Sequence, residues 1–389
     1  MSERRERFDV LVVGAGPIGL ACAWRALERG LSVCVLERGA VGSGASDVAA
    51  GMLAPVGEAS WGEESLLELN LASHALWPAF AEELRDASGM DPGFARSGAL
   101  HVALGRDESE ALRRQHELHR EHDLESEWLT ASECRQLEPG LAPRLAGGVF
   151  APHEGAADPR ALVASLAAAV RVGGGSIEEG VEVVGADTGP PCSVRTTDGR
   201  ERSAEHLVLA TGCHSGQTEW LDPGERPRVR PVKGEIVTLR ERGGERVCSR
   251  IVVGDRLYMV PRPDGRLLVG ATVEEKGFDT TVTAGGVHEL LRESYRTLPE
   301  TAEMELVEIR AGLRPGTPDN GPILGWGPGA VVFATGHFRN GILLAPATAD
   351  AVAALLSGEA PPIDLRPFSP GRFAGTPAVA AAPGPGGSG

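Results

Sequence analysis

Residues able to bind a phosphate-bearing ligand are concentrated in Gly14-Ala15-Gly16-Pro17-Ile18-Gly19, which fits the pattern G-x-G-x-x-G. In this pattern Gly14 makes a tight turn, Gly16 lets the backbone approach a pyrophosphate, and Gly19 allows close packing of helix against strand. The N–H groups at the start of the following helix then face the phosphates. Glu37, roughly 20 residues further on, can accept hydrogen bonds from ribose hydroxyls and selects against a 2′-phosphate. The motif predicts a site for NAD or FAD.

A strand, a helix and a second strand must position these residues, and the hydrophobic pattern supplies them at 8–13, 17–29 and 31–36. Later segments predict a helix at 159–171, strands around Val181 and Val194, a turn at Asp198-Gly199 and a strand at 206–210. The β-rich stretches 228–239 and 256–272 indicate another sheet, with a turn at 263–265. A strand at 331–334 and a helix at 341–356 follow. The pattern predicts an α/β fold with a Rossmann-type domain.

The composition and charge of the chain argue against several classes of protein. A chain of 389 residues with 42% hydrophobic residues is long enough for two domains, and no apolar run reaches the ~18 to 20 residues of a membrane span. The N-terminus lacks the cleavage site of a secretory signal, so we expect a cytoplasmic protein. A net charge of −16 disfavours nucleic acid as a partner. The six cysteines show no C-x-x-C spacing, so we expect neither disulfides nor a zinc site.

Two segments, a stretch with three histidines and the C-terminal tail, are assigned no function. His116, His119 and His122 recur at a spacing of three within a charged stretch predicted to be a helix. A metal site is conceivable, but residues three apart drift around a helix, and a solvated helical face is the favoured interpretation. The tail 374–389 consists almost entirely of Ala, Pro, Gly and Ser, and we expect it to be disordered. No metal ligand is therefore assigned.

Further motifs decide between NAD and FAD: AAGML at 49–53, YMVPR and GRLLVGAT within 258–272, AGLRPGTPDNGPILG at 311–325 and GHFRNGILLAP at 336–346. With these the chain resembles the FAD-dependent amine and D-amino-acid oxidase family, most closely its bacterial glycine oxidases of thiamine biosynthesis. The resemblance implies FAD, held noncovalently because 314–320 contains neither Cys nor His. Besides Gly14, Gly16 and Gly19, the residues expected at the cofactor are Pro17, Ile18, Glu37, Arg38, Ala45, Ser46, Ala50, Gly51, Met52, Val181, Gly212, His337, Phe338, Arg339, Asn340, Gly341, Ile342 and Leu343.

The resemblance also implies three substrate-binding residues. Arg314 lies among turn residues and would hold the substrate carboxylate, because its planar fork can make two parallel hydrogen bonds to a carboxylate. The hydroxyl of Tyr258 would touch the same carboxylate, and Arg339 would border the substrate cavity. A surface salt bridge for Arg314 and packing in an apolar sheet for Tyr258 are the alternatives. No acid or base is assigned, because a neutral amine can drive hydride transfer from Cα to flavin N5 unaided.

The implied reaction is oxidative deamination of glycine, or of sarcosine or D-alanine, with O₂ as electron acceptor. Glycine would give glyoxylate, ammonia and hydrogen peroxide, and its imine would supply the thiazole of thiamine. The N-terminus of the helix predicted to begin at Gly341-Ile342 would stabilise the reduced, anionic flavin. Alternatives are a dehydrogenase that uses another electron acceptor, the flavin domain of a tRNA-modifying protein, and an inactive interaction module.

The resemblance finally implies a domain division and an assembly. Segments 1–85, 150–222 and 312–367 would form the FAD-binding domain. Segments 86–149 and 223–311 would form a substrate-binding domain on a mixed or antiparallel sheet that covers the flavin. Relatives are commonly homotetramers, so a homo-oligomer is possible.

Overall fold

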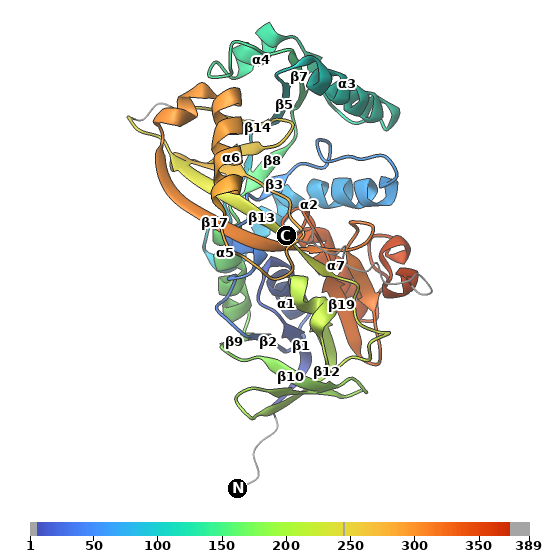
Figure 1. Ribbon diagram of the computed structural model, residues 1–389. Coiled ribbons are helices and arrows are strands. Elements are labelled where there is room, and N and C mark those ends of the chain that lie inside the picture. The colour runs from blue at the N-terminus through green and yellow to red at the C-terminus, as the bar shows by residue number, and fades with distance from the viewer. Residues whose placement is uncertain (1–5, 244–245, 374–389) are drawn as a thin grey trace, which may run out of the picture.

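The computed structural model describes residues 6–243 and 246–373, so the tail at 374–389 lies outside the described residues. Figure 1 shows the elements around two large sheets, one below and one above the middle of the molecule. The helices are α1 (Pro17–Glu28), α2 (Glu64–Ser88), α3 (Arg106–Glu121), α4 (Ala131–Leu137), α5 (Pro159–Val172), α6 (Ala284–Thr297) and α7 (Ala345–Leu356). Within the described ranges, no helix combines the length and the apolar character that a bilayer-spanning segment needs.

The first sheet confirms the predicted Rossmann-type unit, because β1 pairs in parallel with both β2 and β12. Its order is β10-β11-β12-β1-β2-β9, and β19 pairs with the second half of β12 and with β18. The turn at Asp198-Gly199 joins β11 to β12 as predicted. The strands are β1 (Glu6–Val13), β2 (Val33–Glu37), β9 (Ser176–Glu179), β10 (Val183–Asp187), β11 (Cys192–Thr196), β12 (Glu201–Leu209), β18 (Ile323–Trp326) and β19 (Val331–Thr335).

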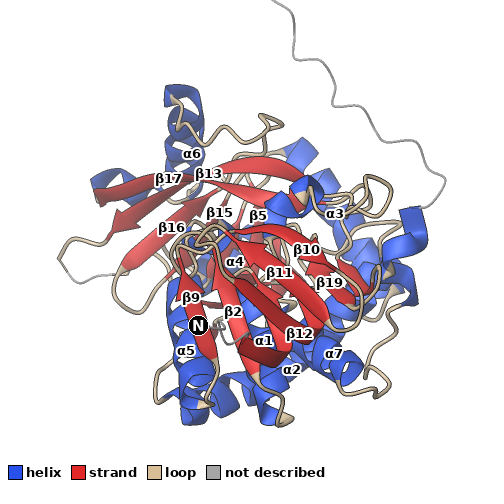
Figure 2. Cartoon of the chain, turned by 90° about the horizontal axis from the view of Figure 1, so that it is seen from below, coloured by secondary structure: helices blue, strands red, loops and turns tan. Residues whose placement is uncertain are grey.

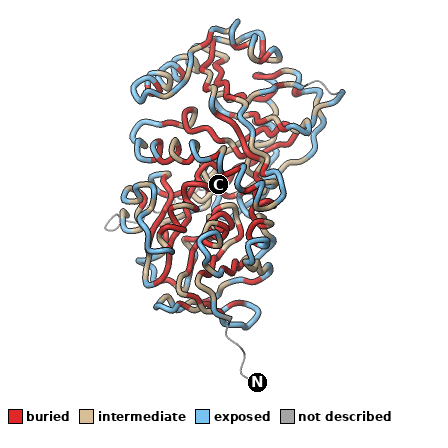
Figure 3. Tube along the Cα trace, turned by 180° about the vertical axis from the view of Figure 1, so that it is seen from behind, coloured by how far each residue is buried: buried red, intermediate tan, exposed pale blue. Residues whose placement is uncertain are grey.

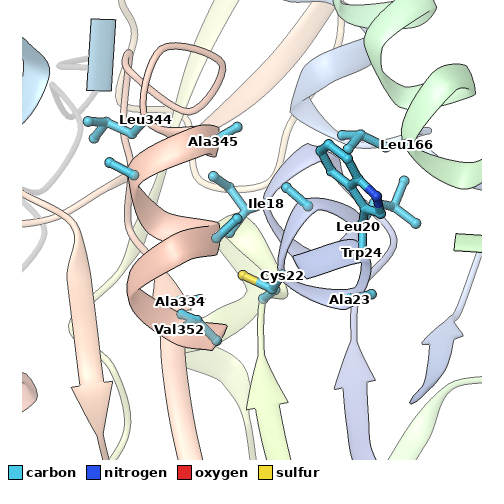
Figure 4. Close-up of a cluster of buried hydrophobic side chains, with 14 of the residues drawn as sticks. Ile18, Leu20, Cys22, Ala23, Trp24, Leu166, Ala334, Leu344, Ala345 and Val352 are labelled. Atoms are coloured by element: carbon cyan, nitrogen blue, oxygen red, sulfur yellow. The ribbon is translucent and has the colours of Figure 1, made fainter. Parts of the chain in front are cut away.

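Both faces of this sheet are covered, which explains why its central strands are apolar throughout. Because side chains alternate along a strand, Val10 and Val12 of β1 pack among α1, α2, α5 and α7, whereas Leu11 and Val13 join a second cluster on the other face. Figure 2 shows these helices along one side of the sheet. In Figure 4 the side chains of α1 are packed between α7 and α5, and Val352 comes from α7.

The second sheet has the order β17-β13-β16-β15-β14-β5-β7-β6. Its pairs are antiparallel except β14 with β5, which confirms the prediction of a mixed or antiparallel sheet. The long strands β13 and β17 reach back towards the first sheet (Figure 1). The strands are β5 (Ala99–Ala103), β6 (Glu127–Leu129), β7 (Gly147–Ala151), β13 (Arg230–Arg240), β14 (Ile251–Val253), β15 (Tyr258–Pro261), β16 (Arg266–Gly270) and β17 (Glu305–Gly316).

A small third sheet, formed by β3 (Met52–Leu53), β8 (Gly155–Ala157) and β4 (Phe94–Arg96), lies between the two large ones. Figure 3 shows buried backbone running continuously through this middle region. The predicted division into two discontinuous domains stays a prediction. Strands β7 and β17 each cross one of its boundaries, at 149–150 and 311–312.

The last helix begins later than the sequence predicted, at Ala345 and not at Gly341. The hydroxyl of Ser73 on α2 donates to the Leu343 carbonyl at 2.7 Å and accepts from the Ala347 N–H at 3.3 Å. Trp77 Nε1 donates to the same carbonyl at 3.0 Å. These side chains replace the regular bond between Leu343 and Ala347, and Pro346 has no N–H to donate to the Ile342 carbonyl, so residues 341–344 form a turn. The prediction of a helix N-terminus at Gly341-Ile342 is therefore wrong.

Candidate active site

A single cavity of about 1650 Å³ extends from the turn after β1 to the underside of the second sheet. Ligand pockets for drug-sized molecules usually measure about 300 to 1,000 Å³, so this cavity has room for a dinucleotide and a small substrate together. One end is lined by Gly14, Gly16 and Glu37, and the other by Tyr258 and Arg314. The structure thus joins the two groups of residues that the sequence predicted separately.

The glycine motif has the geometry that a pyrophosphate requires. Gly14 has a φ of +105°, and a Cβ there would lie 2.5 Å from the Ala210 carbonyl oxygen. A Cβ on Gly19 would lie 2.0 Å from the Gly14 carbonyl oxygen, so Gly19 serves close packing and does not line the cavity. A Cβ on Gly16 would meet no protein atom within 4 Å, and Gly16 faces the cavity. The motif therefore leaves open space at the start of α1, as FAD needs.

Glu37 is held in place by the backbone on both sides. Its Oε2 accepts from the Ala15 N–H at 2.8 Å and its Oε1 accepts from the Gly39 N–H at 2.9 Å. Each carboxylate oxygen has two lone pairs, so both oxygens can still accept hydrogen bonds from ribose hydroxyls in the cavity. The position of Glu37 at the end of β2 thus fits FAD, as the sequence suggested.

Most residues expected at the cofactor line the cavity, and three do not. Those that line it are Gly14, Gly16, Pro17, Ile18, Glu37, Arg38, Ala45, Ser46, Ala50, Gly51, Met52, Val181, Gly212, His337, Phe338, Arg339, Gly341 and Ile342. Gly19 packs against Gly14. Leu343 is only 1% exposed, with its carbonyl bonded to α2. The third is Asn340, whose backbone N–H donates to the His337 carbonyl at 2.8 Å and whose carbonyl accepts from the Leu344 N–H at 2.8 Å. These three do not line the cavity, and their assignment to the cofactor stays a prediction.

His337 is a buried, neutral histidine beside the predicted flavin position. Its Nε2 lies 3.0 Å from the Thr348 hydroxyl on α7, and burial lowers its pKa to about 3. The unfolded chain therefore binds a proton at this position that the folded chain excludes, and stability is lost as the pH falls from about 6.5 towards 3.

We expect the thermal midpoint of the flavin-loaded wild type to fall more steeply between pH 6.5 and 4 than that of a His337→Asn variant, which has no group to titrate there. Scanning calorimetry across this range checks the difference. The exposed His288 supplies the control, and His288→Gln should keep the wild-type slope. Equal slopes in the wild type and His337→Asn would contradict the expectation.

Arg314 lies in the substrate end of the cavity with part of its guanidinium held by backbone. Its Nη1 donates to the Lys233 carbonyl at 3.3 Å and to the Thr272 carbonyl at 3.2 Å. Gly234 on the adjacent strand β13 lies directly beneath the fork, since a Cβ there would approach Nη1 to 2.3 Å. The guanidinium is thus fixed at one nitrogen and half-buried, and its other nitrogens remain able to bind a carboxylate.

Tyr258 stands next to Arg314, with its ring over Gly270, where a Cβ would come within 2.5 Å of the hydroxyl. Burial raises the pKa of the phenol, although Arg314 opposes this effect. The hydroxyl is therefore protonated at neutral pH and can donate to a carboxylate that Arg314 binds.

Replacing Tyr258 with phenylalanine should raise KM for the amino acid at least about tenfold and change kcat little. The reason is that a hydrogen bond to a charged carboxylate contributes about 1.5 to 3 kcal/mol. Steady-state kinetics check this, and Tyr295→Phe is the control because Tyr295 is exposed and does not line the cavity. A fall in kcat at unchanged KM would show that the hydroxyl acts in the reaction and not in binding.

Arg339 also lines the cavity, but it is exposed, and its guanidinium carbon lies 5.1 Å from the centre of the Phe338 ring.

Two further residues that line the cavity, Glu58 and His101, were not predicted from the sequence. Neither stands in a motif with a chemical meaning of its own. The only sequence signal is that Glu58 closely follows the AAGML segment.

At its substrate end the cavity therefore presents cationic and hydroxyl donors for a carboxylate and one carboxylate of its own. At the other end it presents a glycine turn and an acid suited to a dinucleotide. Such an arrangement can hold a small amino acid next to a redox cofactor. Residues 9–355 match the family model described as FAD dependent oxidoreductase, DAO.

Curated relatives and a solved structure agree with this match. Glycine oxidase of Geobacillus kaustophilus is 37% identical over 372 residues, which cover 95% of this chain and 98% of the relative. The bifunctional protein ThiO/ThiG of Synechocystis is 35% identical over 94% of this chain and 54% of its own length. The crystal structure of the Geobacillus glycine oxidase superposes with a TM-score of 0.89 over 94% of this chain and 99% of that one.

Proposed function

Because this chain belongs to the DAO family of FAD-dependent oxidoreductases, we propose that it oxidises glycine and amines or D-amino acids that are little larger, such as sarcosine and D-alanine. The chain is an FAD-dependent amino-acid oxidase, and the choice among these substrates is the proposal. The single observation that carries it is the pairing of Arg314 and Tyr258 in the same cavity as the glycine motif.

The residues of the chain do three things in this proposal. Arg314 binds the substrate carboxylate through its free nitrogens, and Tyr258 donates to the same group. The turn at Gly16 and the carboxylate of Glu37 hold the dinucleotide. Bound FAD supplies a two-electron acceptor that takes the electrons of the substrate and passes them to O₂. We therefore propose glyoxylate, ammonia and hydrogen peroxide as the products from glycine.

A role in thiamine biosynthesis is part of the same proposal. The Synechocystis relative carries the matched region and ThiG in one polypeptide, and this chain spans 54% of that protein. We propose that the imine formed from glycine supplies the thiazole of thiamine. The Geobacillus relative, which is matched over 98% of its length, bears the name glycine oxidase, and this supports glycine as the substrate.

The test is to mix the purified flavoprotein anaerobically with glycine, sarcosine, D-alanine and D-proline, to follow flavin bleaching, and then to admit air and assay peroxide. Glycine should bleach the flavin, and air should restore the colour with one peroxide per turnover. Bleaching without recovery in air would replace the oxidase proposal with a dehydrogenase that uses another electron acceptor. Bleaching by none of the four would overturn the small-amino-acid assignment.

A further inference from the structure

We propose that Glu58 accepts a proton from the ammonium group of the bound amino acid, and that a row of polar side chains behind it passes this proton to the protein surface. We call this row the proton relay; from the cavity outward its members are His101, Glu154, His119, Ser126 and His116. The inference rests on the proposed function, because an amine substrate supplies the proton. An α-amino group is largely protonated at neutral pH, and the ammonium form has no lone pair to drive oxidation at Cα.

Glu58 is placed to take this proton. It lines the cavity together with Arg314, Tyr258 and Arg339, so it faces the space where a carboxylate-bound amino acid would lie. Burial raises the pKa of Glu58, while the charges of Arg339 and Arg314 oppose the increase. A carboxylate whose pKa is raised towards that of the donor is a better proton acceptor than an ordinary one.

His101 and Glu154 lie close enough to Glu58 for their charges to act on its carboxyl group. His101 also lines the cavity and is 6% exposed, and its Nε2 lies 3.8 Å from Oε2 of Glu154, which is 1% exposed. The other carboxylate oxygen of Glu154 accepts from the N–H groups of Val56 and Gly57 at 2.9 and 2.6 Å. A Cβ on Gly57 would lie 2.2 Å from His101 Nε2 and 3.2 Å from Glu154 Oε2. Gly57, the residue before Glu58 in the chain, therefore lies against both the His101 ring and the Glu154 carboxylate.

The outer part of the proton relay comes from α3 and the segment after it. Nδ1 of His119 lies 2.9 Å from the Ser126 hydroxyl, and Nδ1 of His116 lies 3.2 Å from the same oxygen. A hydroxyl both donates and accepts, so it can pass a proton between two imidazoles. His116 and Ser126 are half-buried and reach the surface. The favoured interpretation of this stretch as a solvated face was wrong for His119, which is 1% exposed.

The electrostatic surroundings keep the ring of His119 in the neutral form, which has one nitrogen that donates a proton and one that accepts it. Burial, and then the charge of His101, lower the pKa of His119 to about 4, so its ring is neutral at pH 7. Glu154 is also faced by His74, whose pKa burial lowers, and Arg96 and His153 act on His74. No cluster suited to a metal ion occurs among the described residues, so these rings are not explained as metal ligands.

Three atoms of the proton relay have no hydrogen-bond partner within the described part of the chain: Nε2 of His101, Oε2 of Glu154 and Nε2 of His119. Buried polar atoms are nearly always paired, with protein or with ordered water. His101 lies near both Glu154 and His119, so we infer that bridging water molecules connect these unpaired atoms. The row can therefore conduct a proton from the cavity outward.

The transfer is balanced without any redox change. The N–H bond of the ammonium breaks, an O–H bond forms on the Glu58 carboxylate, and the electron pair stays on nitrogen. Successive transfers through the proton relay then release one proton to solvent and return Glu58 to its ionised form.

The experiment compares the flavin-loaded wild type with Glu58→Gln, His119→Gln and Ser126→Ala. Its control is His122→Gln, which changes an exposed histidine of the same sequence segment. Glycine is mixed anaerobically in weak buffer with a pH indicator, and flavin reduction and proton appearance are followed together. Glu58→Gln should shift the acid limb of the reduction-rate profile upward by at least one pH unit. His119→Gln and Ser126→Ala should keep that limb and slow proton appearance at least tenfold, and added imidazole should restore it.

Proton appearance in His119→Gln and Ser126→Ala as fast as in His122→Gln would overturn the proton relay. An unshifted acid limb in Glu58→Gln would overturn the role of Glu58. Ser126→Ala removes one oxygen atom at a half-buried position, so it keeps the test valid if His119→Gln does not fold. NMR of labelled histidines needs no substrate. Glu58→Gln should shift the ring resonances of His101 at neutral pH, and unmoved resonances would count against the inference even if no amine reduces the flavin.

Discussion

Replacing Arg314 with lysine is expected to lower kcat/KM for glycine about 100-fold, mostly through KM, and to leave the flavin content unchanged. A hundredfold loss corresponds to about 2.7 kcal/mol. Lysine keeps the charge but loses the planar fork, and a single ammonium cannot reach the Lys233 and Thr272 carbonyls while it also binds a carboxylate through two bonds. Anaerobic reduction at increasing glycine concentration gives the binding and reduction constants separately.

Gly234 offers a variant that displaces the same guanidinium without removing it. A Cβ at this position would lie 2.3 to 2.5 Å from three guanidinium atoms of Arg314, so Gly234→Ala must push the fork out of place. We expect a rise in KM of the same kind as in Arg314→Lys. Arg256→Lys is the matched control, because Arg256 also lines the cavity but its side chain is 64% exposed and pairs with acids at the surface. Wild-type KM in both Arg314→Lys and Gly234→Ala would show that the substrate carboxylate is bound elsewhere.

Replacing Gly16 with leucine is expected to give a folded, colourless protein whose affinity for FAD is reduced at least 100-fold. The backbone of Gly16 is extended, with φ −78° and ψ 177°, so a larger residue causes no backbone strain. The new side chain meets no protein atom at its Cβ and projects into the space that a pyrophosphate needs. The flavin-to-protein ratio after purification and the Kd from flavin fluorescence measure the effect.

Gly105→Leu is the control for this experiment. Gly105 precedes α3 as Gly16 precedes α1, it is also extended, and a Cβ there would meet no protein atom within 4 Å. Gly105 does not line the large cavity. Both changes should lower the free energy of unfolding by about 1 kcal/mol through weaker capping of the helix. A difference in flavin content between the two variants therefore reports the effect of the side chain inside the cavity. Equimolar flavin in Gly16→Leu would place the dinucleotide away from the glycine turn.

The amino-acid sequence by itself determined the glycine turn and the acid that we expect to hold the dinucleotide. The strand, the glycine turn, the helix and the acid from Phe8 to Glu37 form one continuous unit, in which each residue is positioned by neighbours close in the chain. Periodicity and glycine spacing describe such local geometry well. For the same reason the turn at Asp198-Gly199 and the strands around it could be predicted.

Tertiary structure decided the features that depend on segments far apart in the chain. Ser73 and Trp77 on α2 bind the Leu343 carbonyl just before α7, and no pattern near Leu343 announces these contacts, although Pro346 is a local signal for the start of the helix itself. Gly234 supports Arg314 because β13 and β17 pair across 80 residues of sequence. Glu58 and His101 reach one cavity because the segment after β3 packs beside β5. Contacts of this kind depend on how separate elements pack, and a pattern within one element does not contain that information.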